Sequence, residues 1–272
     1  MTAGTHEPIA VIVVTHESAA VIDACLAALA PIPGLEVVVV DNGSTDGTVE
    51  RVRAAGHAVI ALDRNRGFAA GANAGAARAR AERLCFLNPD CVLTAEAVAA
   101  ARAAWASAPD AVLVPDFRQQ GSRVVGRQPG YSRRKILADL LETRRAWPRV
   151  RARLQRHPRY HDERWAWPLG TCLFTPRATF TRAGGFDEGY FLYMEDCELG
   201  LALHAIGAPI VALPVTVDHA GCGGSAVATE RRLALLDAAR LRFAAIHYGR
   251  PTAWAMRLVA ATAAFGATLG RR

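Results

Sequence analysis

The sequence lacks the patterns that mark several large classes of protein. Its six cysteines include no CxxC pair, which argues against a zinc site or a small disulfide framework and favours ordinary reduced cysteines. No uninterrupted run of about 18 apolar residues is present, so no helix is expected to span a membrane. Residues 1–8 carry no basic group ahead of an apolar run, so no secretory signal is expected. These absences predict a cytoplasmic protein, or one held peripherally at the inner face of the plasma membrane.

The composition is that of a folded chain with an excess of basic residues. The 272 residues are 51% hydrophobic, which excludes a wholly disordered protein, and the length suits one large domain or two small ones. Lysine and arginine number 32 against 25 acidic residues, which gives a formal net charge of +7. Such an excess favours an anionic partner: nucleic acid, a membrane surface or a phosphorylated small molecule. Composition does not choose among these three.

The excess charge is concentrated in residues 116–165. This segment holds 14 basic and 5 acidic residues, which leaves 18 basic and 20 acidic residues in the rest of the chain. One amphipathic helix is expected near 134–145, followed by a run rich in arginine and aromatic residues. Two interpretations stay open: a solvated connector, as charge runs often are, or a basic surface that faces an anionic partner.

Short apolar runs alternate with helical patterns through the first half of the chain. Strands are expected at 9–14, 35–40, 58–62, 84–87 and 111–114, the last of them after a helix over 94–107. Runs that are apolar throughout, separated by helices, indicate a parallel sheet covered on both faces. The first half is therefore expected to be doubly wound α/β.

The second half continues the alternation less regularly. Strands are expected at 169–175 and 209–213, and helices over 194–206, 230–248 and 254–269. The last helix is too short to cross a bilayer. It either packs on the core or lies in a membrane interface, and the sequence leaves both open.

Polar motifs follow the ends of the expected strands, where parallel α/β sheets bind ligands. Asp41 opens the run DNGSTDGT, and either hydrogen-bonds a nucleobase or ribose or simply belongs to a capped turn. Gly67, Gly71 and Gly75 recur at a spacing of four, which suits either close helix packing or a phosphate at the helix start. Neither a GxGxxG nor a GxxxxGK[ST] pattern is present. Asp90 ends LNPD, where a carboxylate either belongs to a turn or binds a divalent cation.

A second group of polar residues lies between 184 and 221. Glu195 and Asp196 are adjacent at the expected start of a helix, where the helix dipole favours the ionised form. An ionised carboxylate aimed at a substrate hydroxyl is a general base. His219, in the run HAG, is either a structural histidine or a ligand of the same metal as Asp90.

Together and in this order, the motifs resemble the family 2 inverting glycosyltransferases of the GT-A fold, and most of all their bacterial rhamnosyltransferase-like branch. The matching runs, over about residues 8–225, are VIVVTHES, VVVVDNGSTDGT, NRGFAAGANAG, LNPD, GGFDEGYFLYMEDCEL and HAG. The resemblance implies an α/β fold with a doubly wound, mainly parallel sheet. It also implies a Rossmann-like nucleotide-sugar half at 1–115, a basic insert at 116–165 and an acceptor half at 166–225. A C-terminal helical region at 226–272 would then pack on the protein or associate with a membrane.

The resemblance also implies roles for individual residues. Asp196, with Glu195 beside it, is the expected catalytic base. Asp90 and His219 are the expected ligands of Mg²⁺ or Mn²⁺. The nucleotide-sugar site is expected to comprise Thr15, His16, Glu17, Asp41, Asn65, Arg66, Gly67, Asn73, Asn88, Gly170 and Thr171.

The sequence departs from the family pattern at four positions, one of which is His16 in place of a frequent asparagine. Asn88 stands where many members carry aspartate, which leaves one carboxylate for the metal. Glu198 replaces an aspartate, and Ala202 falls where arginine is common. No QxxRW-type run is present, so processive polymer synthesis is not expected.

The implied function is metal-dependent, inverting transfer of a sugar, rhamnose or another deoxyhexose, from a dTDP- or UDP-sugar. The expected acceptor is a hydroxyl of a cell-envelope glycan or of a lipid-diphosphate sugar, and Asp196 takes its proton. Peripheral membrane contact is expected, and a nucleic-acid partner is not. The alternative is a basic membrane- or nucleic-acid-binding module without transferase activity. The sequence does not set the oligomeric state.

Overall fold

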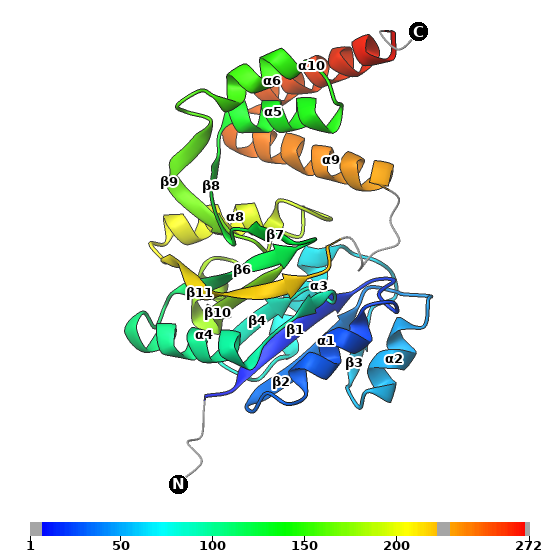
Figure 1. Ribbon diagram of the computed structural model, residues 1–272, viewed down its shortest axis with the longest axis vertical. Coiled ribbons are helices and arrows are strands. Elements are labelled where there is room, and N and C mark those ends of the chain that lie inside the picture. Colours follow the sequence, from blue (N-terminus) through cyan, green and yellow to red (C-terminus); the bar gives the residue numbers. More distant parts are fainter. Residues whose placement is uncertain (1–6, 222–228, 270–272) are drawn as a thin grey trace.

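A nine-stranded mixed sheet forms the centre of the protein (Figure 1). The computed structural model describes residues 7–221 and 229–269; Cys222 therefore lies outside the described residues. The strand order is β3-β2-β1-β4-β10-β6-β11-β5, with β7 beside β6. The strands are β1 (Ile9–Thr15), β2 (Leu35–Asp41), β3 (Val59–Ala61), β4 (Arg83–Leu87), β5 (Cys91–Val92), β6 (Val112–Gln119), β7 (Ser122–Val124), β10 (Cys172–Pro176) and β11 (Ile210–His219).

The strand directions explain why several loops meet at one edge of the sheet. β3, β2, β1 and β4 run parallel, as expected, and β6 and β11 are parallel to each other. β10 runs antiparallel to its neighbours β4 and β6, and Cys172 at its start pairs with Leu87 at the end of β4. The loop that enters β10 therefore lies beside the loop that leaves β4.

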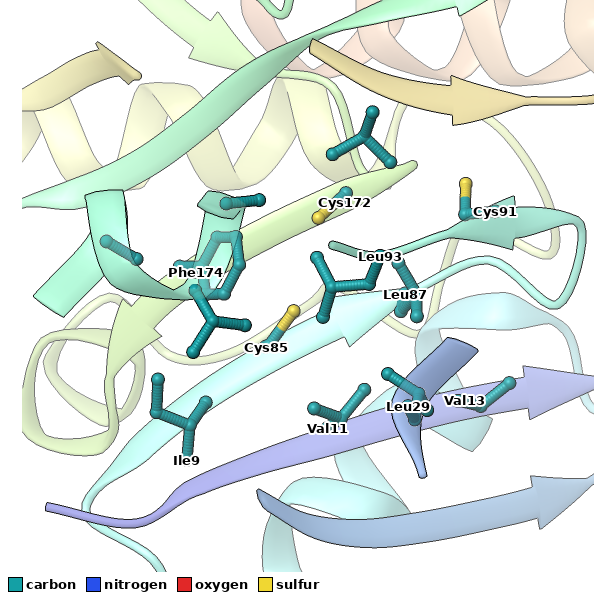
Figure 2. Packing of buried hydrophobic residues seen from close by; sticks show 14 of the residues in the cluster. Ile9, Val11, Val13, Leu29, Cys85, Leu87, Cys91, Leu93, Cys172 and Phe174 are labelled. Atoms are coloured by element: carbon teal, nitrogen blue, oxygen red, sulfur yellow. The ribbon is translucent and has the colours of Figure 1, made fainter. Parts of the chain in front are cut away.

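Alternating side chains of β1 divide the main core into two layers. The odd-numbered residues, Ile9 to Val13, pack with helices α1 (Ile22–Leu29), α2 (Thr48–Ala54) and α4 (Ala95–Ser107). The even-numbered residues, Ala10 to Val14, pack with helices α3 (Phe68–Arg78), α7 (Arg177–Arg182) and α8 (Glu195–Ala205). Figure 2 shows the first layer, in which Phe174 of β10 and the side chains of β1 and β4 form a continuous apolar cluster. The sheet is thus covered on both faces, as the apolar strands predicted.

Two glycines let helix α3 approach the sheet closely. A Cβ atom at Gly75 would lie 2.4 Å from Cγ2 of Ile12, and one at Gly71 would lie 2.7 Å from Cγ1 of Val14. Both separations are shorter than real Cβ contacts, so any side chain here would displace its neighbours. These two glycines, four residues apart, therefore serve close helix packing, which is one of the two interpretations that the sequence left open.

A second core lies at the end of the molecule opposite the N-terminus (Figure 1). It is built from β8 (Arg127–Tyr131), β9 (His161–Pro168), α5 (Arg133–Thr143), α6 (Pro148–Gln155), α9 (Thr229–Tyr248) and α10 (Arg250–Leu269). Trp165 and Trp167 of β9 are buried in it beside Phe243 of α9. Cys197 of α8 belongs to the same cluster, so the second core rests on the helix that carries the expected catalytic pair.

Most of the expected elements are present, but β5 and α7 were not expected and α10 begins at Arg250 instead of 254. β6 and β11 are longer than expected, and β10 begins at Cys172 instead of 169. Leu169 and Gly170 are outside the strand because their N–H groups bond to the Gly126 carbonyl and the Asp196 side chain. The basic segment 116–165 contains β7, β8, α6 and part of β9 in addition to the expected helix.

Several charges of the basic segment are neutralised inside the second core. The Asp139 carboxylate lies 3.1 Å from Nζ of Lys135 and 3.3 Å from the Arg240 guanidinium. Arg144 pairs with Asp237, which also lies 3.4 Å from Arg240. The segment is therefore not a connector whose charges are all solvated.

Helix α10 packs on this core by one face. Ala253, Met256 and Ala260 are buried, whereas Trp254 is exposed. Across the ranges that the structure describes, no helix combines the length and the apolar composition needed to cross a bilayer. Of the two possibilities that the sequence left open for this helix, packing on the core therefore describes its buried face.

Replacing Gly75 by alanine tests the close packing of α3. Alanine is favoured over glycine in a helix by about 1 kcal/mol, so the variant would be more stable if the methyl group fitted. Because the methyl group would overlap Ile12, we expect the free energy of unfolding to fall by about 1–3 kcal/mol, measured by chemical denaturation. Ala77→Gly, at an exposed position of α3, is the control for helix propensity alone and should lose up to about 1 kcal/mol. A Gly75→Ala variant as stable as the wild type would contradict this account.

Candidate active site

A cavity of about 400 Å³ opens at the edge of the sheet where β1 and β4 end and β10 begins. This volume suits a small-molecule ligand. Most of the predicted site residues line it: Thr15, His16, Asn65, Gly67, Asn88, Asp90, Gly170, Thr171, Glu195, Asp196 and His219. The other four predicted residues, Glu17, Asp41, Arg66 and Asn73, lie outside the lining.

Backbone and amide hydrogen bonds fix the loops around the cavity. The Asn88 N–H donates to the Thr171 carbonyl over 2.9 Å, which joins the loop after β4 to the loop before β10. The Asn42 side chain accepts from the Arg66 N–H over 3.3 Å and donates to the Gly67 carbonyl over 3.0 Å. Asn42 is a lining residue that the sequence reasoning missed, although it stands directly after Asp41 in the motif.

The expected catalytic pair begins helix α8. The two preceding residues, Tyr193 and Met194, have left-handed backbones with φ of 71° and 69°, which non-glycine residues adopt rarely. One oxygen of the Asp196 carboxylate accepts from the Gly170 N–H over 2.9 Å, and the other accepts from the Cys197 N–H over 2.8 Å. The side chain is thus held between a loop of the sheet and the first turn of its own helix.

Burial raises the pKa of both carboxyl groups of the pair. For Asp196, burial raises the pKa above 3.8, and hydrogen bonds from backbone N–H groups oppose this change. For Glu195, burial and the neighbouring Asp196 charge both raise the pKa. In the described part of the chain, Oε2 of Glu195 has no hydrogen-bond partner. Both carboxyl groups are therefore harder to ionise than exposed ones, Glu195 by its burial and the neighbouring Asp196 charge together.

The two expected metal ligands come together in the cavity lining. His219 ends β11, and its strand pairs with β5 next to Asp90. Oδ1 of Asp90 lies 3.3 Å from Nε2 of His219, and the Cys91 sulfur lies within 4.8 Å of both ligand atoms. A carboxylate oxygen beside an imidazole nitrogen suits a transition-metal ion such as Mn²⁺ better than Mg²⁺, which prefers oxygen ligands alone. These donors therefore fit a divalent cation.

The start of helix α3 meets the loop that precedes α8. Gly67 has φ of +91°, and a Cβ atom there would lie 2.3 Å from the Phe191 carbonyl oxygen. The same oxygen accepts a hydrogen bond from the Phe68 N–H over 3.0 Å. Oδ1 of Asn65 accepts from the Gly67 N–H over 2.9 Å. Gly67 is thus required for a close backbone contact between two loops of the site.

Asp41 lies behind the cavity lining. The residue is 1% exposed, and its carboxylate accepts from the Thr15 hydroxyl over 2.8 Å and from the N–H and hydroxyl of Ser44 over 2.8 and 2.6 Å. Asp41 thus holds Thr15, which does line the cavity, in position. Glu17 accepts from the Thr45 N–H over 2.7 Å and joins the loops after β1 and β2. Direct contacts of Asp41 and Glu17 with a nucleotide stay predictions.

Asn73 and Arg66 contact the loop between α7 and α8. The Asn73 amide donates to the Phe186 carbonyl over 2.9 Å and accepts from the Phe186 N–H over 3.1 Å. The Arg66 guanidinium lies 3.6 Å from the Glu188 carboxylate. Both side chains connect α3 to the loop that leads into Glu195 and Asp196, and their contacts with a sugar nucleotide also stay predictions.

Helix α9 supplies lining residues that the sequence reasoning missed. Arg231, Arg232 and Leu235 line the cavity, and Nε of Arg232 lies 3.3 Å from the Tyr193 hydroxyl oxygen. No motif marks them, because α9 is placed over the cavity by packing at its far end, where Phe243 enters the second core. Tyr193 also lines the cavity, and its place in the quoted motif two residues before Glu195 could have marked it as a site residue.

Comparison with known proteins identifies relatives over most of the chain. The family model described as Glycosyl transferase family 2 matches residues 10–173. Validoxylamine A glucosyltransferase of Streptomyces hygroscopicus subsp. jinggangensis is 31% identical over 240 residues, covering 76% of this chain and 54% of that protein. The N-acetylglucosaminyl-diphospho-decaprenol L-rhamnosyltransferase of Mycobacterium tuberculosis is 27% identical over 208 residues, covering 66% and 64%. The chain thus spans between about half and two thirds of the length of these relatives.

A solved structure has the same fold. The mannosyltransferase PcManGT from Pyrobaculum calidifontis, in complex with GDP-Man and Mn²⁺, gives a TM-score of 0.53 at 21% identity, covering 97% of this chain and 80% of that one. The family model spans more than half of this chain. The sheet order, the sequence of motifs and these matches agree that the chain belongs to glycosyl transferase family 2 and has the GT-A fold.

Proposed function

We propose that this protein transfers a sugar from a nucleoside diphosphate sugar to an acceptor hydroxyl, with inversion of configuration. The observation that carries the proposal is the Asp196 carboxylate, which is held by two N–H groups in the cavity that Asp90 and His219 also line. A base for the acceptor proton and ligands for a cation that accompanies a diphosphate are two requirements of this reaction. One cavity supplies both.

Asp196 acts as the general base. The acceptor oxygen bonds to the anomeric carbon as the bond from that carbon to the diphosphate oxygen breaks, and Asp196 takes the hydroxyl proton. Because attack occurs opposite the leaving group, the configuration inverts without a covalent bond to the protein. The raised pKa of Asp196 makes it a stronger base near neutral pH than an exposed aspartate. Burial and the Asp196 charge raise the pKa of Glu195, which disfavours a second negative charge beside the base.

Asp90 and His219 are the proposed cation ligands, with Mn²⁺ a better match than Mg²⁺. When bound, the cation acts as a Lewis acid that stabilises negative charge on the departing diphosphate. Arg231 lines the same cavity and contributes a positive side chain to it. Asn88 also lines the cavity, and its neutral amide leaves Asp90 as the carboxylate of the LNPD turn.

For the substrates, we infer a dTDP- or UDP-linked deoxyhexose donor, with rhamnose first, and a lipid-diphosphate or cell-envelope glycan acceptor. The mycobacterial relative, named as an L-rhamnosyltransferase of N-acetylglucosaminyl-diphospho-decaprenol, supports this choice. The Streptomyces relative is named as a glucosyltransferase, so hexose donors are the second class to test. A lipid-linked acceptor would place the protein at the inner face of the plasma membrane. A basic binding module without transferase activity would leave the buried carboxylate pair unexplained.

Asp196→Asn tests the base. Asparagine retains an oxygen for one N–H donor but cannot take a proton, so we expect kcat to fall by about 10²–10⁴-fold. Release of nucleoside diphosphate measures kcat, and calorimetric titration of UDP or dTDP should give unchanged affinity. The melting temperature reports on folding separately, because the asparagine NH2 group would face one of the two N–H donors while the buried charge is removed. Glu198→Gln, on the same helix but outside the cavity lining, is the control, and near wild-type turnover in Asp196→Asn would contradict the assignment.

The pH dependence of kcat/KM tests the burial of the base. Only the deprotonated carboxylate accepts a proton, so activity is lost as the pH falls through the pKa of Asp196 in the folded protein. Because burial raises that pKa, we expect the acid limb of the profile to lie clearly above pH 3.8, the value of an exposed aspartate. The residual activity of Asp196→Asn should lack this limb. An acid limb at or below pH 3.8 would show that the base is not this buried group.

Binding of Mn²⁺ tests Asp90 and His219 without reference to turnover. We expect Asp90→Asn and His219→Ala each to weaken Mn²⁺ binding in the presence of UDP or dTDP by about tenfold or more, measured by electron paramagnetic resonance of free Mn²⁺. Asp218→Asn removes the neighbouring exposed carboxylate, which pairs with Arg118, and should leave the affinity unchanged. Chelation by EDTA should abolish transfer in the wild type. Unaltered Mn²⁺ affinity in both variants would exclude these ligands.

A further inference from the structure

Residues 143–161 and 238–272 are two of several stretches of the chain that contain arginine and no acidic residue. Residues 143–161 hold seven arginines and residues 238–272 hold six. All 25 acidic residues lie outside these stretches, together with only 19 of the 32 basic ones. These two segments together hold 13 of the 32 basic residues, and they are about 80 residues apart in the sequence.

The fold brings these two stretches to one end of the molecule. Leu154 of α6 and Val259 of α10 both pack against Leu141 and Ala146, so the two helices share one small core beside α5. Figure 1 shows α5, α6 and α10 together at the end opposite the N-terminus, with α9 between them and the sheet. We refer to the exposed side of α6 and α10 as the α6–α10 face.

Part of the arginine in these stretches is neutralised, and part is not. Arg144 pairs with Asp237, and Arg240 pairs with Asp139 and Asp237. These acidic residues lie in the second core and are mostly buried. Within the ranges 7–221 and 229–269, a further set of arginines is exposed and forms no ion pair: Arg149, Arg153, Arg156, Arg250 and Arg257.

Large apolar side chains are exposed among these unpaired arginines. On α10, Trp254 is 66% exposed and Leu258, one turn further on, is 45% exposed. Arg250 and Arg257 are exposed and lie at helical spacing from Trp254, beside Trp254 and Leu258 on the surface of α10. An indole, an aliphatic side chain and two guanidinium groups therefore share one helix surface.

Helix α6 repeats this combination. Trp147, directly before α6, is 42% exposed, and Val150 is 45% exposed. Arg149 and Arg153 are exposed on the same short helix. Trp147 has φ of 44°, a conformation that non-glycine residues adopt rarely, so the chain turns sharply where it leaves this indole partly exposed.

We propose that the α6–α10 face docks on an anionic phospholipid surface. Exposed tryptophan and aliphatic side chains flanked by arginine are the features of helices that lie in a membrane interface, with indoles at head-group level and guanidinium groups on phosphates. The phosphate backbone of a nucleic acid would match the arginines but would leave Val150 and Leu258 without a partner. Because one face of α10 is packed on the protein, only its exposed face can contact lipid, and the helix would lie along the bilayer plane.

Helix α9 connects this face to the cavity. Leu235 lines the cavity, and α9 ends at Tyr248, two residues before α10 begins. At a rise of about 1.5 Å per residue, the helix spans about 20 Å between these points. Docking would therefore hold the cavity at a short, fixed distance from the bilayer. That use of the surface, presenting a lipid-linked acceptor to Asp196, rests on the proposed function, whereas docking itself does not.

Flotation of the full chain with vesicles tests the proposal. We expect the wild type to bind vesicles of about 30% phosphatidylglycerol in phosphatidylcholine and to bind pure phosphatidylcholine far more weakly. Arg250→Gln with Arg257→Gln should weaken binding to the anionic vesicles by about 25-fold, or about fivefold per arginine. Trp254→Ala with Leu258→Ala should weaken it by about tenfold or more, and should do so at high salt as well.

A matched change elsewhere is the control. Arg53→Gln with Arg78→Gln removes two exposed arginines from α2 and α3 and should leave vesicle binding unchanged. All variants should keep the wild-type melting temperature and its increase on adding nucleotide with Mn²⁺. Equal binding by the α10 variants, or equal affinity of the wild type for a single-stranded oligonucleotide, would overturn the proposal. Vesicle binding without transfer would refute only the proposed function, and transfer to a water-soluble acceptor without vesicle binding would refute only the docking surface.

Discussion

The hydrogen bond from the Gly170 N–H to the Asp196 carboxylate is the contact on which the candidate site depends. It joins the loop that enters β10 to the first turn of α8, so it fixes this helix, which carries the proposed base, against the sheet. A Cβ atom at Gly170 would lie 3.4 Å from Cβ of Asp196, an ordinary van der Waals contact, so the two segments are packed together at this bond. The same bond stabilises the ionised carboxylate in a place where burial disfavours it.

The main sheet could be predicted from sequence because its strands are continuous apolar runs and its helices have regular spacing. The pairing of β8 with β9 could not be predicted, since their register shifts between Pro129 and Gly130 and no regular alternation marks the two strands. Trp165 and Trp167 stand next to a run of charges, and only the distant Phe243 explains why they are buried. The motifs contain the proposed base and cation ligands, which the fold brings into one cavity, but the contribution of α9 to that cavity arises from tertiary packing alone.

The basic segment shows how a charge count can be correct and still describe the wrong surface. Lys135 and Arg144 belong to the segment, yet both are paired with carboxylates of the second core. Asp237, the partner of Arg144, lies in a helix about 90 residues away. A count along the sequence cannot separate such internal charges from those of the α6–α10 face, because the separation depends on which helices pack together. The folded protein concentrates the unpaired charge on fewer residues than the sequence suggested.

The contact between Gly67 and the Phe191 carbonyl has a consequence for how this site can evolve. It links the start of α3 to the loop before α8 through main-chain atoms, and the Phe68 N–H completes the link. Side chains along that loop can therefore be exchanged to suit new substrates while the two halves of the site stay in register. Gly67 itself cannot be exchanged, since any other residue would place a Cβ atom against the Phe191 carbonyl. In the loop before α8, the side chains are thus free to set substrate specificity, while the main-chain atoms hold the architecture of the site.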